Sequence, residues 1–178
     1  ANIKRMKETI QQSKFVIMQL EIPIPVVKYT LELCRELNVP VLLNPAPASG
    51  FQLEFMDYVA YLTPNETECE LIFGQNMEAT LEKYPNKLIV TLGSEGARYF
   101  DGTKHILVPG FKTTAVDTTG AGDTFNGALA HALGQSLSLE EAVRYANASA
   151  SLSVEKFGAQ GGMPSHTEVV KRLEGVSN

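Results

Sequence analysis

The sequence contains no tryptophan, only two cysteines, and no apolar run of the roughly 20 residues that a membrane-spanning helix needs. Cys34 and Cys69 lie within stretches of helical pattern and have no Cys-x-x-Cys spacing. We therefore expect reduced thiols in a soluble cytoplasmic protein, and neither a disulfide framework nor a zinc site. A single disulfide between the two cysteines remains an alternative.

Strong charge of either sign is also lacking, since 15 Lys and Arg against 20 Asp and Glu give a formal net charge of −5. Basic residues are scattered among acidic ones, so neither nucleic acid nor a membrane is expected as a partner. The sequence has no Walker A motif, no Gly-x-Gly-x-x-Gly after its first strand, no Gly-x-Ser-x-Gly and no His-Glu-x-x-His. These absences argue against P-loop, dehydrogenase, serine-hydrolase and zinc-protease functions.

Apolar, strand-like runs alternate along the chain with longer segments of helical period, which is typical of α/β proteins. With 178 residues, 44% of them hydrophobic, the chain can bury a core, and one domain spanning residues 1–178 is expected. Short apolar runs bounded by turn residues suit a parallel sheet covered on both faces; they occur at 15–20, 41–43, 58–62 and 88–92. A hairpin across Asp101-Gly102 is expected at the sheet edge.

Helices are predicted at 25–37, 125–133 and 139–157. Three helix starts carry the pattern of a capping box, in which a hydroxyl and a Glu three residues later satisfy backbone N–H groups. These pairs are Thr63 with Glu66, Ser138 with Glu141, and Ser165 with Glu168. Pro64 would then occupy the first helical position, where its missing N–H costs nothing.

The most informative segment runs from Asp117 to Gly127 and reads DTTGAGDTFNG. Gly120 and Gly122 permit a tight turn, and the apolar helix that follows places free N–H groups and a positive helix end there. Asp123 could accept a proton from a hydroxyl that attacks a bound phosphoryl group. On spacing alone, a Gly-rich turn in which Asp123 merely complements the helix dipole is an equally good interpretation.

This segment closely resembles the C-terminal signature of the ribokinase family, the phosphofructokinase B type carbohydrate kinases. Five further segments are similar to that family in its order: MQLE at 18–21, LNPAP at 43–47, TPNETE at 63–68, TLGSEG at 91–96 and KFGAQ at 156–160. The resemblance covers nearly the whole chain. It implies an α/β, ribokinase-like (Rossmann-like) fold, a mainly parallel sheet flanked by helices.

The resemblance also implies roles for individual residues. Asp123 would deprotonate the sugar hydroxyl, and the backbone amides of Gly120, Ala121 and Gly122 would form an anion hole. Contacts to ATP are implied for Asn65, Glu68, Thr91, Gly93, Ser94, Gly96 and Asn147. Glu68 would also reach Mg²⁺ through water, which suits an ion that keeps part of its water shell. Glu21 would join Asp123 in contacting the sugar.

A monovalent cation, K⁺, is implied by the match of two loops, mostly through backbone carbonyls. The residues are Asp117, Thr119, Ser153, Lys156 and Gly158. Each implied role has a plain structural alternative. Asn65 and Glu68 could simply begin a solvated helix, and the glycines near Gly93 could form the turn into the hairpin. Asn147 could only pack against its neighbours, and Glu21 could be an ordinary surface charge. The two loops could contact each other without binding a cation.

The first part of the family pattern has no counterpart here, so the N-terminal strands and the lid are expected to be missing. The expected reaction is transfer of the γ-phosphoryl group of ATP to D-ribose, giving ribose 5-phosphate, because 44–47 and 158–160 look closer to ribokinases than to fructokinases or adenosine kinases. The alternatives are another acceptor, such as fructose or adenosine, and a non-catalytic nucleotide-binding fragment. Alone, the chain is expected to be inactive; a homodimer remains open for the complete enzyme.

Overall fold

The computed structural model describes residues 6–175, so the predicted domain of residues 1–178 extends beyond the described part at both ends. The chain divides into two compact units. Unit 1 comprises Ala1–Thr91 and Tyr99–Ile106, and unit 2 comprises Leu92–Arg98 and Leu107–Asn178.

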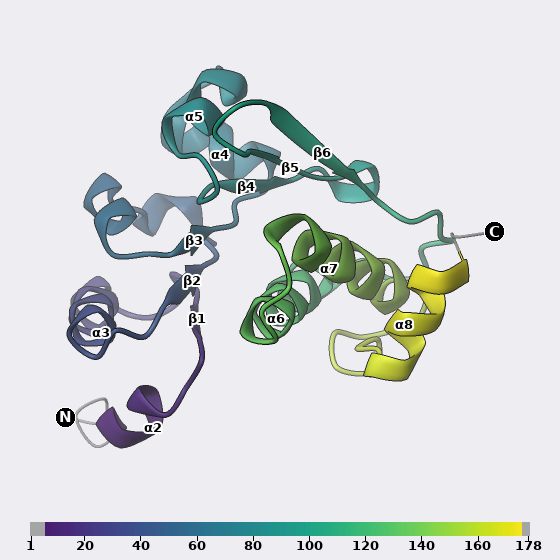
Figure 1. Ribbon diagram of the computed structural model, residues 1–178, viewed down its shortest axis with the longest axis horizontal. Helices are drawn as coiled ribbons and strands as arrows, with labels where there is room; N and C mark the ends of the chain where they lie inside the picture. Colours follow the sequence, from purple (N-terminus) through teal and green to yellow (C-terminus); the bar gives the residue numbers. More distant parts are fainter. Residues whose placement is uncertain (1–5, 176–178) are drawn as a thin grey trace. The chain divides into compact units, whose positions relative to one another are not determined.

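Unit 1 contains a parallel sheet of order β1-β2-β3, formed by β1 (Val16–Met18), β2 (Val41–Leu43) and β3 (Tyr61–Leu62) (Figure 1). Two isolated parallel bridges, Leu62 with Leu88 and Asn65 with Thr91, continue this pairing to β4 (Ile89–Thr91). All three residues of β2 are buried, as an apolar strand in a covered parallel sheet should be. The four predicted parallel strands are therefore confirmed: β2 has the predicted bounds, and the other three are shorter than predicted.

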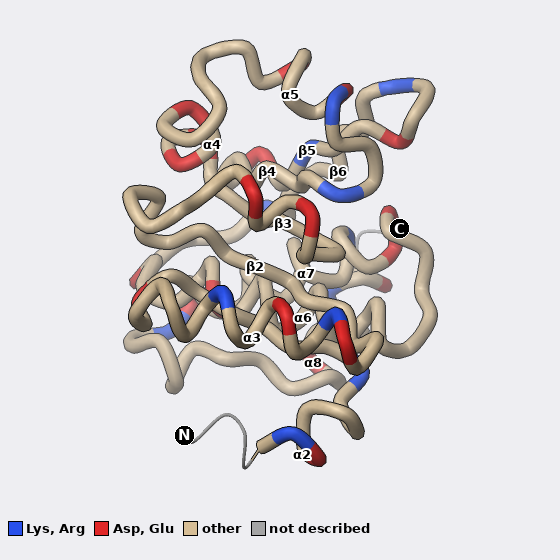
Figure 2. The backbone as a smooth tube through the Cα atoms, turned by 90° about the vertical axis from the view of Figure 1, so that its left-hand side faces the viewer, with Lys and Arg blue, Asp and Glu red and all other residues tan. Residues whose placement is uncertain are grey.

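The helices of unit 1 are α2 (Lys7–Gln11), α3 (Ile24–Glu36), α4 (Glu66–Phe73) and α5 (Met77–Lys83), with short 3₁₀ turns η1 (Ala48–Gly50) and η2 (Leu53–Asp57). Val27, Leu31 and Cys34 are buried on α3 at the spacing of one helix face, which explains why the apolar residues of this segment recur every three or four positions. Acidic and basic residues are interspersed along its length (Figure 2).

Three predicted features differ in the structure. The helix predicted to begin at Thr63 begins at Glu66 instead, because the Thr63 N–H still donates to Leu43 O in the sheet and Pro64 O still accepts from Thr91. The strand predicted at 58–62 is limited to its last two residues, since 58–60 follow directly from the 3₁₀ turn η2. The third difference is the end of the helix predicted at 139–157, which lies at Ser153.

The predicted hairpin forms β5 (Gly96–Phe100) and β6 (His105–Pro109), in a sheet of order β4-β5-β6 with β6 at its edge. The division between the two units runs through this hairpin. Its turn is organised by Asp101, whose carboxylate Oδ1 accepts hydrogen bonds from Thr103 and Lys104. These bonds lower the pKa of Asp101 to about 2, and the bond from the Thr103 side chain makes the largest contribution.

Unit 2 contains the 3₁₀ turn η3 (Gly93–Glu95) and three helices, α6 (Ala121–Gly134), α7 (Leu139–Ser153) and α8 (His166–Gly175). α6 packs on α7, and α7 packs on α8 (Figure 1). The predicted capping boxes of Ser138 and Ser165 are confirmed by hydrogen bonds to Glu141 and Glu168. Within residues 6–175, no helix has the length and apolar character needed to cross a membrane.

Candidate functional site

The Gly-rich segment forms a sharp turn into α6. Gly120 precedes the helix with φ of 78°, a left-handed conformation that favours glycine. Asp123 lies in the first turn of α6 and is exposed. This arrangement brings a carboxylate and the positively polarised end of a 14-residue helix together, as the sequence predicted.

Of the three amides predicted to form an anion hole, two have no hydrogen-bond partner among residues 6–175. These are the N–H groups of Gly120 and Gly122, whereas the N–H of Ala121 donates to Thr118 O over 3.2 Å. A Cβ atom at Gly122 would meet nothing within 4 Å, so the backbone there is open to a ligand. The turn can therefore bind an anion such as a phosphoryl group.

The loop that follows α7 packs directly on this turn. A Cβ atom at Gly120 would lie 2.7 Å from the Cβ of Ala159, so a side chain there has no room. Asp117 joins the same two segments, because its Oδ1 accepts from the Thr119 N–H and its Oδ2 accepts from the Gly158 N–H, both over 2.9 Å. Hydrogen bonds lower the pKa of Asp117. The bond from the Thr119 side chain has the largest effect, followed by the bonds from the backbone N–H groups of Gly158 and Thr119.

The structure thus brings Asp117, Thr119 and Gly158 of the predicted cation set together. Ser153 is buried, and its hydroxyl donates to Ala150 O within α7, which leaves its backbone carbonyl as the group it could offer. The Lys156 ammonium lies 3.3 Å from the Glu168 carboxylate, so its side chain points to a partner on α8. For Ser153 and Lys156, only backbone carbonyls are therefore candidate ligands.

In unit 1, Asn65 and Glu68 form the capping box of α4. The Glu68 N–H donates to Asn65 Oδ1 over 2.8 Å, and the Asn65 N–H donates to Glu68 Oε2 over 2.9 Å. Thr91 lies beside Asn65 at a parallel bridge. The capping box uses one oxygen of each side chain, which leaves Asn65 Nδ2 and Glu68 Oε1 for a ligand. The sequence pattern Asn-x-x-Glu could have identified this cap.

In unit 2, the turn formed by Gly93, Ser94 and Gly96 packs against the end of β6. Gly93 and Gly96 have φ of 56° and 109°, and a Cβ atom at Gly96 would collide with Val108 O. Asn147, buried on α7, supports the same segment, because its Nδ2 donates to Val108 O over 2.9 Å and to Pro109 O over 3.2 Å. Asn147 therefore has a structural task whether or not it also contacts a nucleotide.

Glu21 is exposed after β1 and makes no hydrogen bond or ion pair within the described part of the chain. Groups of three or more His, Cys, Asp or Glu that could hold a metal are also absent from residues 6–175.

Cys34 and Cys69 are buried as free thiols, and burial raises the pKa of Cys69 to about 11.

Two contacts around the Gly-rich turn were not predicted. Ala159 packs against Gly120 and so holds the turn in place. The only sequence signal for this contact was the small size of the alanine in the segment KFGAQ. Glu155 joins the segment before the turn to α8, because its Oε1 accepts from the Thr113 hydroxyl over 2.5 Å and from the Arg172 guanidinium over 2.7 Å. These hydrogen bonds lower the pKa of Glu155, and the bond from Thr113 has the largest effect.

Comparison with known proteins supports the predicted fold. The family described as pfkB family carbohydrate kinase matches residues 5–166. A ribokinase of Lactococcus lactis is 48% identical over 168 residues, which are 94% of this chain and 56% of that protein.

Solved structures of two ribokinases have the same fold. That of Thermotoga maritima is 38% identical with a TM-score of 0.84, over 94% of this chain and 59% of that one. That of Arabidopsis thaliana, complexed with ribose and ATP, is 32% identical with a TM-score of 0.84, over 96% of this chain and 59% of that one. These likenesses confirm the ribokinase-like α/β fold, and the chain spans somewhat more than half the length of each relative.

Proposed function

The chain belongs to the pfkB family of carbohydrate kinases, and on that premise we propose that it supplies the catalytic base and nucleotide contacts of an ATP-dependent kinase that phosphorylates D-ribose. The observation that carries this proposal is the turn into α6, where open backbone N–H groups and the Asp123 carboxylate occur within four residues. Because the chain spans 56% of the Lactococcus lactis relative, the proposal concerns its share in the reaction of a whole enzyme.

In the proposed reaction, the Asp123 carboxylate accepts the proton of a ribose hydroxyl. The hydroxyl oxygen then forms a bond to the γ-phosphorus of ATP while the bond from that phosphorus to the bridging oxygen of ADP breaks. The products are ribose 5-phosphate and ADP. The N–H groups of Gly120 and Gly122, with Ala121 if its bond to Thr118 opens, would donate to the phosphoryl oxygens and stabilise their charge.

The proposed nucleotide contacts follow the family match. Asn65, Glu68 and Thr91 would bind phosphate oxygens or the water around Mg²⁺; the backbone of Gly93, Ser94 and Gly96 would lie along the nucleotide, and Asn147 beside adenine. Glu21 would contact the acceptor. These assignments rest on the family match and on the polar atoms that the local hydrogen bonds leave unused.

Mg²⁺ and K⁺ are part of the proposal. Mg²⁺, when bound, neutralises phosphate charge; Glu68 Oε1 could accept hydrogen bonds from its water shell, whereas Asn65 Nδ2 could donate to a phosphate oxygen. K⁺ prefers oxygen ligands, and the loops joined by Asp117 and Gly158 supply a carboxylate with backbone carbonyls nearby. Its binding would hold the Gly-rich turn in place through Thr119, Ser153, Lys156 and Gly158.

The alternative is a nucleotide-binding chain without catalytic function. A chimera separates the two: this chain replaces the matching part of the Lactococcus lactis ribokinase, and ADP release is measured with ribose, fructose and adenosine. We expect ribose to be the best acceptor. Asp123→Asn should lower kcat by at least about 100-fold while ATP binding is retained.

The exposed Asp57→Asn variant of the chimera is the control for removing one carboxylate. A chimera that folds and binds ATP but does not turn over, or an Asp123→Asn variant with normal kcat, would contradict the proposed role of Asp123. A clear preference for fructose or adenosine would overturn ribose as the acceptor.

A further inference from the structure

The segment between β6 and α6 leads into the Gly-rich turn, yet it forms no helix or strand. Residues 112–116 are all exposed, and Val116, the largest apolar side chain among them, is 48% exposed. Burial of apolar surface therefore does little to hold this part of the chain. Polar contacts with other segments must offset the entropy lost in ordering it.

These polar contacts go to the end of α7. Within residues 6–175, every hydrogen bond that joins residues 112–117 to another segment ends on residues 154–158. The N–H groups of Val116 and Asp117 both donate to Val154 O, over 2.7 and 3.2 Å. They satisfy a carbonyl at the end of α7 that has no partner within the helix. The segment before the Gly-rich turn is therefore supported by the end of α7.

The position of Glu155 in this support depends on α8. Glu155 Oε1 accepts hydrogen bonds from the Thr113 hydroxyl over 2.5 Å and from Arg172 Nη2 over 2.7 Å. Arg172 Nη1 donates to the hydroxyl of Ser151, four residues before Glu155, over 3.2 Å. The Arg172 side chain is only 20% exposed, so protein oxygen atoms replace much of the water around its charge. Arg172 thus orients the oxygen atom to which the Thr113 hydroxyl donates.

A second link between α8 and the same support is weaker. The Lys156 ammonium lies 3.3 Å from Glu168 Oε1, and both side chains are exposed to solvent. Ion pairs of this kind contribute little, because water screens the charges and two flexible side chains must be ordered. The contact of Arg172 with Glu155 is therefore the main polar connection from α8 to the segment before the turn.

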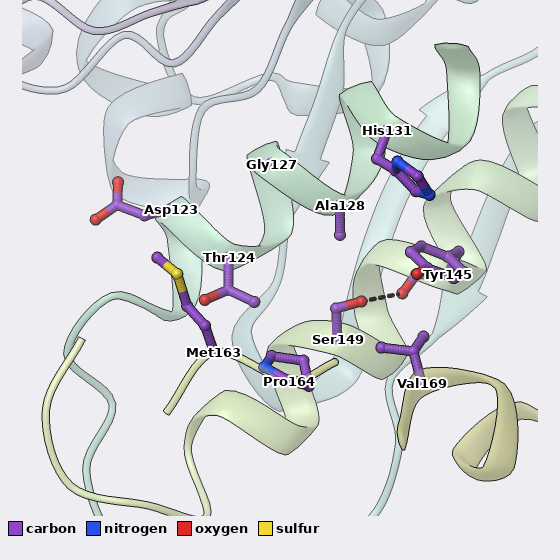
Figure 3. Close-up of a pocket in the computed structure, with 10 residues that line it drawn as sticks. All are labelled: Asp123, Thr124, Gly127, Ala128, His131, Tyr145, Ser149, Met163, Pro164 and Val169. Atoms are coloured by element: carbon purple, nitrogen blue, oxygen red, sulfur yellow. Dashed lines mark hydrogen bonds between the residues drawn. The ribbon is translucent and has the colours of Figure 1, made fainter. Parts of the chain in front are cut away.

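The side chain of α8 that lies nearest in the groove between α6, α7 and α8 does not approach the turn. Val169 lines this groove, but it lies toward the end away from Asp123 (Figure 3). Arg172 lies further along α8, and its hydrogen bonds go to Ser151 and Glu155. Arg172 can therefore act on the turn only through the residues that it contacts.

From these contacts we propose that Thr113, Glu155 and Arg172 are positioning residues that hold the Gly-rich turn in its anion-binding arrangement. This inference rests on the proposed function, because it concerns the turn that would bind the phosphoryl group. Arg172 orients the Glu155 carboxylate, and the carboxylate holds Thr113, so that the chain enters the turn from a fixed direction. A turn that is already ordered loses less entropy when it binds an anion.

The first measurement is amide hydrogen exchange of the 178-residue chain, because exchange reports local opening at each residue. Thr113→Val removes the hydroxyl and keeps the side-chain shape, so it should increase the exchange rates of the Val116 and Asp117 amides about tenfold. Thr113→Ser keeps the hydroxyl and should retain the wild-type rates. Thr114→Val is the matched control, since Thr114 is exposed and makes no hydrogen bond within the described part of the chain.

The contribution of α8 is tested with Arg172→Met, which should increase the exchange of the same two amides as Thr113→Val does. Lys171→Met removes an exposed positive charge from α8 and is the control that should leave them unchanged. Because Arg172 acts through Glu155 on Thr113, the double variant Thr113→Val with Arg172→Met should exchange no faster than Arg172→Met alone. All rates are compared with those of buried amides in the middle of α6, which report general stability.

The second measurement is the affinity of the chain for Mg·ATP, followed by the chemical shifts of the Gly120 and Gly122 amides. Thr113→Val and Arg172→Met should each raise the Kd about fivefold, because the turn must then be ordered on binding. Thr113→Ser should retain the wild-type Kd. A contact that served only the stability of α8 would not produce this rescue by a hydroxyl at position 113.

The proposal is overturned if exchange at Val116 and Asp117 in Thr113→Val does not rise relative to α6, if the two single variants bind Mg·ATP as the wild type does, or if their effects on exchange add in the double variant. A wild-type chain in which Mg·ATP shifts neither glycine amide would contradict the proposed function instead, and exchange would still decide whether the three residues hold the segment. Thr113 is exposed, so its substitution tests the proposal even if Arg172→Met prevents folding.

Discussion

The Cβ of Ala159 lies 2.7 Å from the position that a Cβ atom would occupy on Gly120. Ala159 therefore makes glycine necessary at the turn into α6 for a second reason, in addition to the left-handed φ of 78°. The segment after α7 and the segment before α6 are thus fitted to each other, and Asp117 joins them by its hydrogen bond to Gly158.

Gly120→Ala should lower the free energy of unfolding of this chain by about 2 to 4 kcal/mol, because it adds both a strained φ and a steric collision. Gly122→Ala is the matched control: it has no positive φ and no neighbour within 4 Å, so stability should stay the same or rise by up to roughly 1 kcal/mol. Denaturant unfolding measures both. The double variant Gly120→Ala with Ala159→Gly should recover only part of the steric loss, because the Cα of residue 159 also lies 2.9 Å from the added Cβ, and no recovery at all would show that the Ala159 side chain is not the obstacle.

Asp117 should make the stability of the chain depend on pH in the acid range. Hydrogen bonds from Thr119 and Gly158 lower its pKa in the folded state, so its contribution is complete above the unfolded value of about 3.9 and is lost as the pH falls through the folded pKa. An asparagine at position 117 has only one side-chain oxygen. It can therefore accept a hydrogen bond from the N–H of Thr119 or of Gly158 but not from both, since its amide nitrogen is a donor.

We therefore expect a lower Tm for Asp117→Asn than for the wild type near pH 6, with a difference that shrinks as the pH falls below about 4. Thermal unfolding followed by circular dichroism measures it, and the exposed Asp57→Asn variant is the control for charge removal. A Tm difference that stays constant down to pH 2 would exclude the carboxylate as the origin of the effect.

A K⁺ site at the loops of Asp117 and Gly158 predicts a cation-dependent activity. In the chimera with the Lactococcus lactis ribokinase, we expect kcat to rise severalfold with KCl and little with NaCl or LiCl, because the carbonyl ligands would be spaced for the larger ion. Asp117→Asn should reduce this response. Equal rates in the three salts at the same ionic strength would leave the loop match a structural contact only.

The isolated 178-residue chain should bind Mg·ATP weakly, with a Kd in the high micromolar to millimolar range, or about 4 to 6 kcal/mol. It should release no ADP in response to ribose above background, because reaction requires both substrates to be held in alignment and the chain spans 56% of its Lactococcus lactis relative. Calorimetry with ATP and a coupled ADP assay test the two parts. Ribose-dependent turnover by this chain alone would refute the second.

Local sequence determined those features that a short pattern of residues specifies by itself. The apolar run Val41–Leu43 became a buried strand, and Ser138 and Ser165 cap their helices as their spacing to Glu141 and Glu168 predicted. The turn from Gly120 to Asp123 could likewise be predicted, because left-handed backbone and an apolar helix leave few alternatives.

Tertiary contacts decided the rest, because they connect residues that are distant in the sequence. The start of α4 was misjudged since Leu43 and Thr91 hold residues 63 and 64 in the sheet, which moves the cap from Thr63 to Asn65. The end of α7 at Ser153 coincides with hydrogen bonds from the N–H groups of Val116 and Asp117 to Val154 O.

The functional surroundings of the turn were decided in the same way. The composition near Asp123 did not reveal that Ala159 covers Gly120. The sequence by itself determined where an anion and a base could meet, because glycine, a helix start and a carboxylate are consecutive. Only the tertiary structure decided which side chains surround them, because those contacts form when α6, α7 and α8 pack together.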